Sequence, residues 1–412
     1  MRKAQKSEKP HPRMSRNGEK GEKGTFCVPA HIPESDTLLA AARPLALWYA
    51  ENARSLPWRE GREPYRVWLS EVMLQQTRIE AVRPYYARFL EAAPTPVALA
   101  ALPEDRLMKL WQGLGYYSRA RNLHRAARVI VERHGGALPA DYDALRALPG
   151  VGEYTAGAIA SIAFGLPTPA VDGNVLRVVA RVLGDDSNVL DPDTKKRVTA
   201  ALSCVYREAD KDESLKSALC ARRAGLSVPA ALTEGLMELG QTRCLPNREP
   251  LCEGCPLASL CAVKRSRAWD KIPYREKQKA RKKEARLVLL LADEAGRFAI
   301  RRRPDRGLLA SLFELPSILL PTGKESDEAL DTLGRAFCKE HGLVSEESAS
   351  LSDARHIFTH IEWQMKGRFF NVSRTEATDD ALVFASPREI GEDYALPSAF
   401  SSYLAWIGGE NK

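Results

Sequence analysis

Four cysteines in one short segment restrict the fold of this chain more than any other feature. Cys244, Cys252, Cys255 and Cys261 follow the pattern Cys-x7-Cys-x2-Cys-x5-Cys. Four thiolates at such intervals suit a tetrahedral metal site, which can hold either Zn²⁺ or a [4Fe–4S] cluster. The spacing alone does not decide between the two. We therefore predict a metal-binding loop over residues 244–261.

Length and charge set the class of protein. The 412 residues, 44% of them hydrophobic, are enough to bury more than one core. The formal net charge of +8 favours a polyanionic partner such as a nucleic acid. No apolar run is long enough to span a membrane, and the N-terminus lacks the apolar stretch of a secretory signal. We expect a cytoplasmic protein without a membrane partner, associated with the nucleoid if the source is bacterial.

The sequence divides into four segments. Residues 1–34 are rich in Lys, Glu, Gly and Pro, which predicts a disordered basic tail. Apolar residues at three- and four-residue spacing predict an all-helical domain over 35–262. A basic linker over 263–284 follows. Short apolar runs such as "LVLLLADEAGRFAIRRRP" and "IEWQMKGRFFNV" predict strands, and hence a smaller α+β domain over 285–408.

The stretch "LPGVGEYTAGAIA" predicts a tight turn between two helices over residues 144–165. A nucleotide-binding loop would need a preceding strand, and none is predicted there. The backbone N–H groups of Gly150, Val151 and Gly152, at the start of the second helix, suit a DNA backbone phosphate. A plain helix–turn–helix connection is the alternative.

Two carboxylates are candidates for catalysis. Glu71 lies beside the apolar face of a helix predicted over 64–82, where burial would raise its pKa and keep a proton on it at neutral pH. A solvated surface glutamate is the alternative. Asp172 precedes Gly-Asn in "PAVDGNVLRVVAR", and taken alone it is best interpreted as a helix N-cap.

Together these stretches resemble the helix–hairpin–helix DNA glycosylases, and within them the MutY-type adenine glycosylases, which remove adenine mispaired with 8-oxoguanine. The resemblance covers about residues 38–405. It rests on the cysteine loop and on seven stretches: "LPWR" (56–59), "WLSEVMLQQT" (68–77), "LWQGLGYYSRARNLHRAA" (110–127), "LPGVGEYTAGAIASIAFG" (148–165), "VDGNVLRV" (171–178), "RGLLASLFELP" (306–316) and "HIFTHIEW" (356–363).

The resemblance implies a [4Fe–4S] cluster rather than zinc, two helical lobes with a base pocket between them, and a Nudix-like C-terminal domain that reads 8-oxoguanine. The implied substrate is duplex DNA with an A:8-oxoguanine or A:G mismatch. The enzyme would be a monofunctional hydrolase of the N-glycosidic bond that leaves an abasic site. We expect a monomer; whether a sliding clamp or another repair protein binds it stays open.

Site roles are carried over by the same resemblance. Glu71 is implied as the acid that protonates adenine, and Asp172 as the carboxylate that stabilises the sugar cation. The remaining implied roles are pocket support, including a hydrogen bond to Asp172 (Tyr154, Asn174), wedging into the duplex (Gln76, Tyr116) and 8-oxoguanine recognition (Phe358, Thr359, His360).

Three departures from the family pattern stand out. The first cysteine spacing is x7, whereas the family usually has x6. Residues 215–231 are predicted to be an insertion. Residues 358–360 read Phe-Thr-His where the family often has Phe-Ser-His.

Three other functions are alternatives. A bifunctional glycosylase/lyase resembling endonuclease III would need a lysine where Tyr154 stands. An active Nudix pyrophosphohydrolase would need glutamates for Mg²⁺, but Ala336 and Lys339 occupy two of those positions and leave only Glu340. A non-catalytic DNA-binding protein would make Glu71 and Asp172 incidental.

Overall fold

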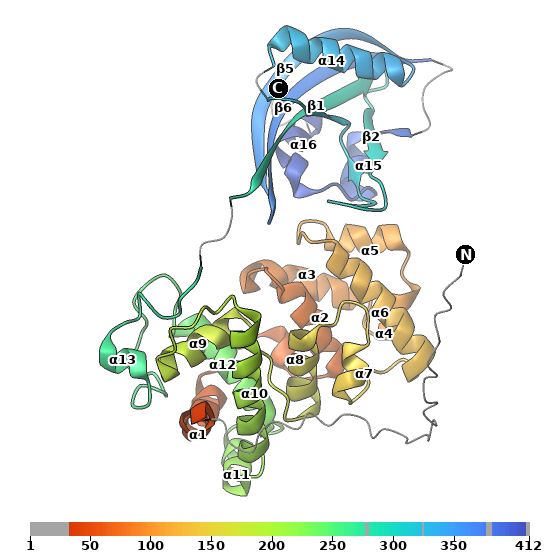
Figure 1. Cartoon of the computed structure of the whole chain (residues 1–412). Helices are drawn as coiled ribbons and strands as arrows, with labels where there is room; N and C mark the ends of the chain where they lie inside the picture. Colours follow the sequence, from red (N-terminus) through yellow and green to blue (C-terminus); the bar gives the residue numbers. More distant parts are fainter. Residues whose placement is uncertain (1–32, 277–279, 324, 376–380, 409–412) are drawn as a thin grey trace, which may run out of the picture.

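The computed structural model describes residues 33–276, 280–323, 325–375 and 381–408 (Figure 1). The tail predicted over 1–34 lies outside these residues except for its last two. Those two, Pro33 and Glu34, begin helix α1, so the helical domain starts slightly earlier than predicted.

The helical domain contains thirteen α-helices and one 3₁₀-helix among the described residues. In chain order they are α1 (Pro33–Asn52), η1 (Pro57–Arg59), α2 (Pro64–Leu74), α3 (Ile79–Ala92), α4 (Pro96–Ala101), α5 (Glu104–Trp111), α6 (Ser118–His134), α7 (Tyr142–Arg146), α8 (Glu153–Phe164), α9 (Gly173–Leu183), α10 (Pro192–Ala209), α11 (Glu213–Arg222), α12 (Val228–Thr242) and α13 (Ala262–Ser266).

These helices form two lobes that share one hydrophobic core. Helices α2–α8 form the first lobe, and α9–α12 form the second (Figure 1). Helix α1 comes first in the chain but packs against α10 and α12 of the second lobe. Helix α12 begins at a Ser227 cap and is buried along most of its length; it contacts α8 of the first lobe and α9 of its own. The two lobes therefore meet along α8 and α12.

The helix predicted over 64–82 is wrong in one respect, because the structure has two helices there. Helix α2 ends at Leu74 and α3 begins at Ile79, with Gln76 in the left-handed region between them (φ 58°). The buried guanidinium of Arg119 on α6 donates hydrogen bonds of 2.8 Å to the carbonyls of Val72, Met73 and Gln75. These bonds satisfy the carbonyls that a helix end leaves without partners.

The second domain is built on a mixed seven-stranded sheet. Its elements are β1 (Lys282–Asp293), β2 (Phe298–Arg302), β3 (Phe313–Glu314), β4 (Ser317–Leu320), α14 (Asp327–Glu340), β5 (Leu343–Ile357), β6 (Ile361–Arg374), β7 (Leu382–Ala385), α15 (Pro387–Glu392), η2 (Ser398–Phe400) and α16 (Ser401–Ile407). The strand order is β3-β2-β1-β6-β5, with β4 paired to β1 and β7 to β2. Strands β1 and β6 are parallel, and the other pairs are antiparallel.

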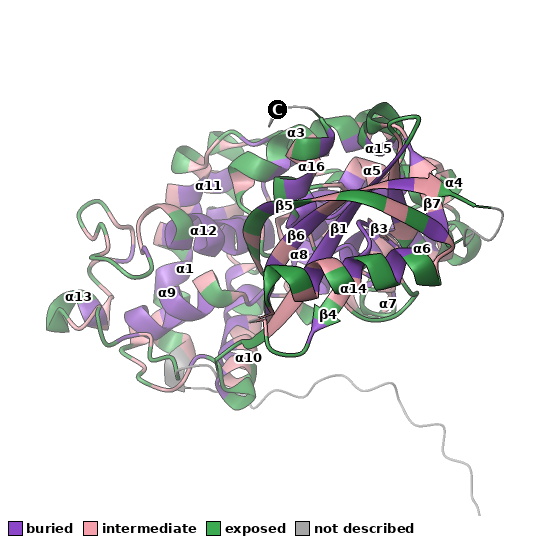
Figure 2. Cartoon of the chain, turned by 90° about the horizontal axis from the view of Figure 1, so that it is seen from above, coloured by how far each residue is buried: buried purple, intermediate pink, exposed green. Residues whose placement is uncertain are grey.

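Both faces of the central strands are buried (Figure 2). Successive side chains of a strand point to opposite faces. Leu287, Leu289 and Leu291 accordingly pack beneath α14, while Val288 and Leu290 join the core on the α16 side. An all-helical domain followed by a domain with a mixed sheet confirms the predicted fold class.

The segment between the domains differs from the predicted linker over 263–284. Its first residues belong to α13, and its last three begin β1. None of the helices in the described part of the chain is both long and apolar enough to cross a membrane.

The two domains are in contact along α5 and the loop that follows it (Figure 1). The Lys109 ammonium donates to the carbonyl of Tyr394 at 3.1 Å, and the Gln112 amide donates to the carbonyl of Leu396 at 3.1 Å. Both donors reach backbone carbonyls, so this part of the contact depends on the path of the C-terminal chain more than on its side chains.

Candidate active site

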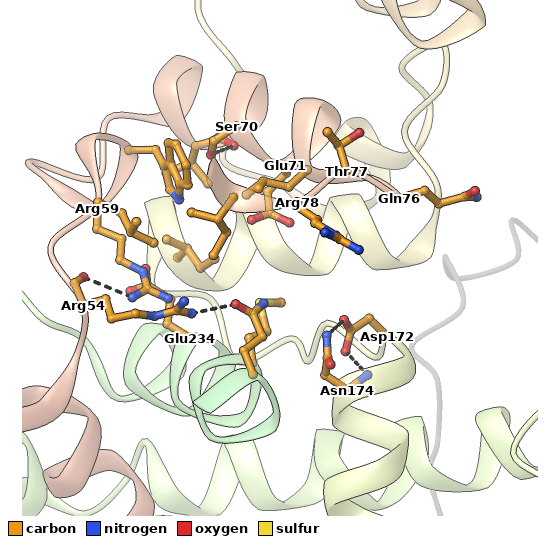
Figure 3. Close-up of a pocket in the computed structure, with 18 of the residues that line it drawn as sticks. Arg54, Arg59, Ser70, Glu71, Gln76, Thr77, Arg78, Asp172, Asn174 and Glu234 are labelled. Atoms are coloured by element: carbon orange, nitrogen blue, oxygen red, sulfur yellow. Dashed lines mark hydrogen bonds and ion pairs between the residues drawn. The ribbon is translucent and has the colours of Figure 1, made fainter. Parts of the chain in front are cut away.

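A cavity of about 530 Å³ lies between the two helical lobes. Glu71 enters it from α2, Tyr154 from α8, Asp172 from the start of α9 and Glu234 from α12. Figure 3 shows Glu71 and Asp172 on opposite walls of this cavity. Residues that are far apart in the sequence thus form one polar site between the two lobes.

Glu71 is buried, with 7% of its surface exposed. Burial raises the pKa of its carboxyl from 4.5 to about 7. The hydrogen bond from Tyr154 opposes that rise, while the charges of Asp172 and Glu234 add to it. A carboxylic acid with this pKa is partly protonated at neutral pH, so it can act as a proton donor.

Tyr154 does not support Asp172 as predicted. Its hydroxyl instead donates a hydrogen bond of 2.8 Å to Oε2 of Glu71. Burial raises the pKa of Tyr154 well above 10, and the charges of Glu71 and Asp172 raise it further. This partner could not be predicted from the sequence, because Glu71 and Tyr154 come from different helices. Tyr154 therefore remains a neutral hydroxyl that orients the Glu71 carboxyl.

Asp172 is both the helix cap and the second carboxylate of the cavity. Its Oδ1 accepts hydrogen bonds from the backbone N–H groups of Asn174 (2.9 Å) and Val175 (2.8 Å). The Asn174 side-chain amide donates to Oδ2 at 2.7 Å. These contacts hold the Asp172 side chain in one orientation, so the two interpretations of this residue do not exclude each other.

A glycine brings the Asp172 segment close to α8. A Cβ atom built on Gly157 would lie 2.3 Å from the carbonyl oxygen of Pro169. Any larger residue at position 157 would therefore push away the segment that leads to Asp172. The position of Asp172 in the cavity depends on this close approach.

Sequence reasoning missed an ionic network on the cavity wall. Arg59 is buried and forms ion pairs with Glu234 (3.3 Å) and Glu238 (2.8 Å), and Arg54 pairs with Glu238 at 2.6 Å. Burial opposes the charge of Arg59, but Tyr49 and the two glutamates raise its pKa overall. Two glutamates four residues apart in the apolar helix α12 were a signal of this network, since charged residues are rarely buried unless paired.

The predicted hairpin lies between α7 and α8. Gly150 has a left-handed backbone (φ 76°), and a Cβ there would lie 2.5 Å from Cβ of Asn122 on α6. Gly152 is the N-cap of α8, which has no side-chain cap bond. Val151 differs from its predicted role: its side chain is buried and its N–H donates to the carbonyl of Leu148 within the turn. An anion at this turn would therefore meet the amides at the start of α8.

Gln76 and Tyr116 share an unusual backbone geometry. Both are exposed non-glycine residues in the left-handed region, with φ of 58° and 48°. Such strain is common at functional sites. Gln76 lines both the cavity of Glu71 and a second cavity of about 520 Å³, which lies between the two domains and is also lined by Tyr116.

The second cavity contains all three predicted 8-oxoguanine residues. The Thr359 hydroxyl forms a hydrogen bond of 2.7 Å with the hydroxyl of Tyr116. Phe358 packs edge-on against Trp363, with 4.8 Å between ring centroids, and thereby anchors the loop. Thr359 and His360 are exposed. The structure thus places Gln76 and Tyr116 of the helical domain beside the Thr359 loop of the second domain.

The four cysteines line one small pocket beside α9. The guanidinium of Arg181 lies 3.4 Å from the Cys244 sulfur and would balance thiolate charge there. Burial and repulsion between thiolates raise the pKa of Cys252, Cys255 and Cys261, to about 11 for Cys255. Within the described residues, no His, Cys, Asp and Glu side chains are grouped closely enough to hold a single metal ion. The donor set, four thiols around one pocket with a nearby cation, fits a thiolate-bound group.

Arg177 connects the cysteine loop to the active site. Its guanidinium donates to the carbonyl of Cys244 (2.9 Å), the carbonyl of Gly240 (2.7 Å) and the side-chain oxygen of Asn174 (2.9 Å). Asn174 in turn holds Asp172. A displacement of the cysteine loop would therefore be transmitted to the Asp172 carboxylate through the side chains of Arg177 and Asn174.

Comparison with known proteins identifies both domains. The HhH-GPD superfamily of base excision DNA repair proteins matches residues 69–207, and the NUDIX domain matches residues 287–406. The chain is 34% identical over 384 residues to the adenine DNA glycosylase of Arabidopsis thaliana, which covers 81% of this chain and 57% of that protein. It is 33% identical over 375 residues to that of Rattus norvegicus, covering 78% and 69%.

The chain thus spans a little over half the length of the Arabidopsis relative and about two thirds of the rat relative. Among solved structures, a thermostable thymine-DNA glycosylase is 26% identical, with a TM-score of 0.42 over 57% of this chain and 97% of the other.

Proposed function

Since this chain belongs to the adenine DNA glycosylase family, we propose that it hydrolyses the N-glycosidic bond of adenine mispaired with 8-oxoguanine or guanine in duplex DNA. The observation that carries this proposal is a buried Glu71, with a pKa near 7, facing Asp172 across a cavity of base-accommodating size. The product is free adenine and an abasic site. The target base leaves the duplex stack to enter the cavity, which costs about a few kcal/mol and costs less when the base is mispaired.

Glu71 and Asp172 divide the chemistry between them. Adenine is a poor leaving group, so Glu71 transfers its proton to N7 of the base as the glycosidic bond breaks. The Asp172 carboxylate, which accepts hydrogen bonds from the first backbone N–H groups of α9, stabilises the positive charge that develops on the sugar. Water then attacks C1′ of the sugar. Tyr154 keeps the Glu71 carboxyl in place through its hydrogen bond.

The opposite base is read at the second cavity. Gln76 and Tyr116 fill the space that the adenine vacates, and Thr359 and His360 contact 8-oxoguanine. The support for this role is the common location of these four side chains along the cavity between the domains. The hydroxyl pair of Tyr116 and Thr359 supplies both a donor and an acceptor at that position.

The turn before α8 binds a backbone phosphate of the DNA. Support comes from Gly152, which leaves the first amides of the helix without a side-chain cap. The macrodipole of α8 favours an anion at this end.

The cysteine loop holds a [4Fe–4S] cluster. Cys244, Cys252, Cys255 and Cys261 are its ligands, and when bound it would fix the loop beside α9. Arg177 and Arg181 of α9 tie the loop to that helix through hydrogen bonds to the carbonyls of Cys244 and Leu245. Purified protein should contain iron and sulfide at about four each per chain, as a [4Fe–4S] cluster requires; stoichiometric zinc in anaerobic preparations would contradict the assignment.

A bifunctional lyase is not favoured. That chemistry needs an amine that attacks C1′, and among the described residues that line the cavity none is a lysine. Borohydride should therefore trap little protein–DNA adduct, and the strand should stay intact until heat or base is applied. Tyr154→Lys should gain trapping.

The decisive test is single-turnover release of base from duplexes with adenine opposite 8-oxoguanine, guanine, cytosine or thymine. Adenine should be released fastest opposite 8-oxoguanine. Glu71→Gln should abolish release and still bind the mismatch, because the amide keeps the side-chain shape without the proton. Asp172→Asn should behave similarly. Substantial release by Glu71→Gln would remove Glu71 from its role.

A further inference from the structure

The chain that leaves the cysteine loop is docked on the helical domain before it reaches the second domain. The N–H of Val189 donates to the carbonyl of Tyr274 at 3.1 Å, and the N–H of Glu276 donates to Oδ1 of Asn188 at 3.4 Å. Buried Arg181 donates to the carbonyl of Ile272 at 2.9 Å. Residues 272–276 therefore have a defined position beside α9.

This docking places the side chain of Arg275 at the start of α9. A Cβ built on Gly173, the residue after Asp172, would lie 3.4 Å from Nη2 of Arg275. Arg275 is exposed, and in the part of the chain that the structure describes its guanidinium makes no hydrogen bond or ion pair. Its neighbour Arg177, in contrast, uses its guanidinium for contacts within the protein.

The charge of Arg275 acts on this site. Burial lowers the pKa of Arg177, and the positive charges of Arg181 and Arg275 add to that effect. A phosphate beside this guanidinium would accept charge-assisted hydrogen bonds, which are stronger than hydrogen bonds between neutral groups. The Asp172 carboxylate is already occupied by Asn174 and the α9 backbone.

We propose that Arg275 binds a phosphate that flanks the target adenosine, and so positions its sugar against Asp172. The inference rests on the proposed function, in which C1′ of that sugar comes next to the Asp172 carboxylate. The 5′ and 3′ phosphates are attached to the same sugar, so one of them comes within reach of a guanidinium beside Gly173. The planar fork of arginine matches two phosphate oxygens.

The test measures whether the effect of the Arg275 side chain on binding depends on the charge of one phosphate. Binding is measured with a Glu71→Gln background, which prevents cleavage, on A:8-oxoguanine duplexes that carry a neutral methylphosphonate at the 5′ or the 3′ phosphate of the target adenosine. One of these replacements should weaken binding when Arg275 is present and have no further effect in Arg275→Ala. On the unmodified duplex, Arg275→Ala should reduce the slope of log affinity against log salt by about 0.9, the value for one lost phosphate contact.

Two variants serve as controls. Arg248→Ala removes the same charge from an exposed arginine of the cysteine loop, and its effect should add to that of either methylphosphonate. Arg275→Lys should keep part of the coupling, because it retains the charge without the fork.

The proposal is overturned if the loss of affinity caused by Arg275→Ala adds to the loss caused by the methylphosphonate at both the 5′ and the 3′ phosphate. Adenine release by the unmodified enzyme is measured in parallel. Release without coupling would reject only the role of Arg275, whereas absence of release would reject the proposed function itself.

Discussion

At the scale of single residues, the proposed role of Glu71 as the proton donor predicts the pH range of the reaction. In that role only the acid form is active, and burial raises the pKa of its carboxyl to about 7. The single-turnover rate constant of adenine release should therefore be level below about pH 7 and fall about tenfold per pH unit above it. Tyr154→Phe removes a hydrogen bond that stabilises the carboxylate, so the midpoint should move to higher pH. A rate that rises from pH 6 to pH 9 would contradict this role.

The same carboxyl makes stability depend on pH. Its pKa is about 7 in the folded protein and 4.5 ordinarily, so the folded state binds the extra proton between these values. Stability from this group is complete below pH 4.5 and is lost as pH rises through 7, by up to about 3 kcal/mol. Glu71→Gln has no charge to bury, so it should raise Tm relative to the parent at pH 8. Thermal melts at pH 6 and pH 8 measure the difference, which should be smaller at pH 6.

At the scale of elements, the turn between α7 and α8 contains two glycines that are needed for different reasons. Gly150→Ala introduces a side chain at φ 76° and close to Asn122, so it should lower stability by about 1–3 kcal/mol. Gly152 has an extended backbone with no atom within 4 Å of an added Cβ. Gly152→Ala should leave Tm unchanged and weaken DNA binding, because its methyl group meets the phosphate. Melting curves and salt-dependent binding distinguish the two, and equal losses of Tm would refute the distinction.

Elements with strong local signals could be predicted from the sequence, and those set by distant contacts could not. The helical character of residues 35–262 and the turn at Gly150 follow from spacing and glycine placement. The break between α2 and α3 is set by Arg119, which lies far along the chain. The partner of Tyr154 is also a tertiary contact: a tyrosine at the head of α8 does not reveal that Glu71 of α2 lies opposite. For the same reason, two glutamates in an apolar helix indicate that Glu234 and Glu238 are paired but do not reveal that Arg59 is their partner.

At the scale of the whole molecule, the proposed function assigns the discrimination between 8-oxoguanine and guanine to the interface between the domains. Thr359→Val keeps the shape of the side chain and removes the hydroxyl that bonds Tyr116. The ratio of adenine release rates opposite 8-oxoguanine and guanine should fall by about tenfold, the effect of one hydrogen bond of roughly 1.4 kcal/mol. Thr359→Ser restores the hydroxyl and should keep the ratio. An unchanged ratio in Thr359→Val would show that other side chains distinguish 8-oxoguanine from guanine.

The packing of α1 against α10 and α12 has a consequence for the chain during its synthesis. The ribosome produces Glu71 early, but the walls around it need α8, the start of α9 and Glu234 and Met237 of α12. Helix α1, although made first, has no surface to pack on until those later helices leave the exit tunnel. A partly translated chain therefore carries Glu71 without the walls of its cavity. Under the proposed function, it should not depurinate nucleic acid around it until the second lobe has been made.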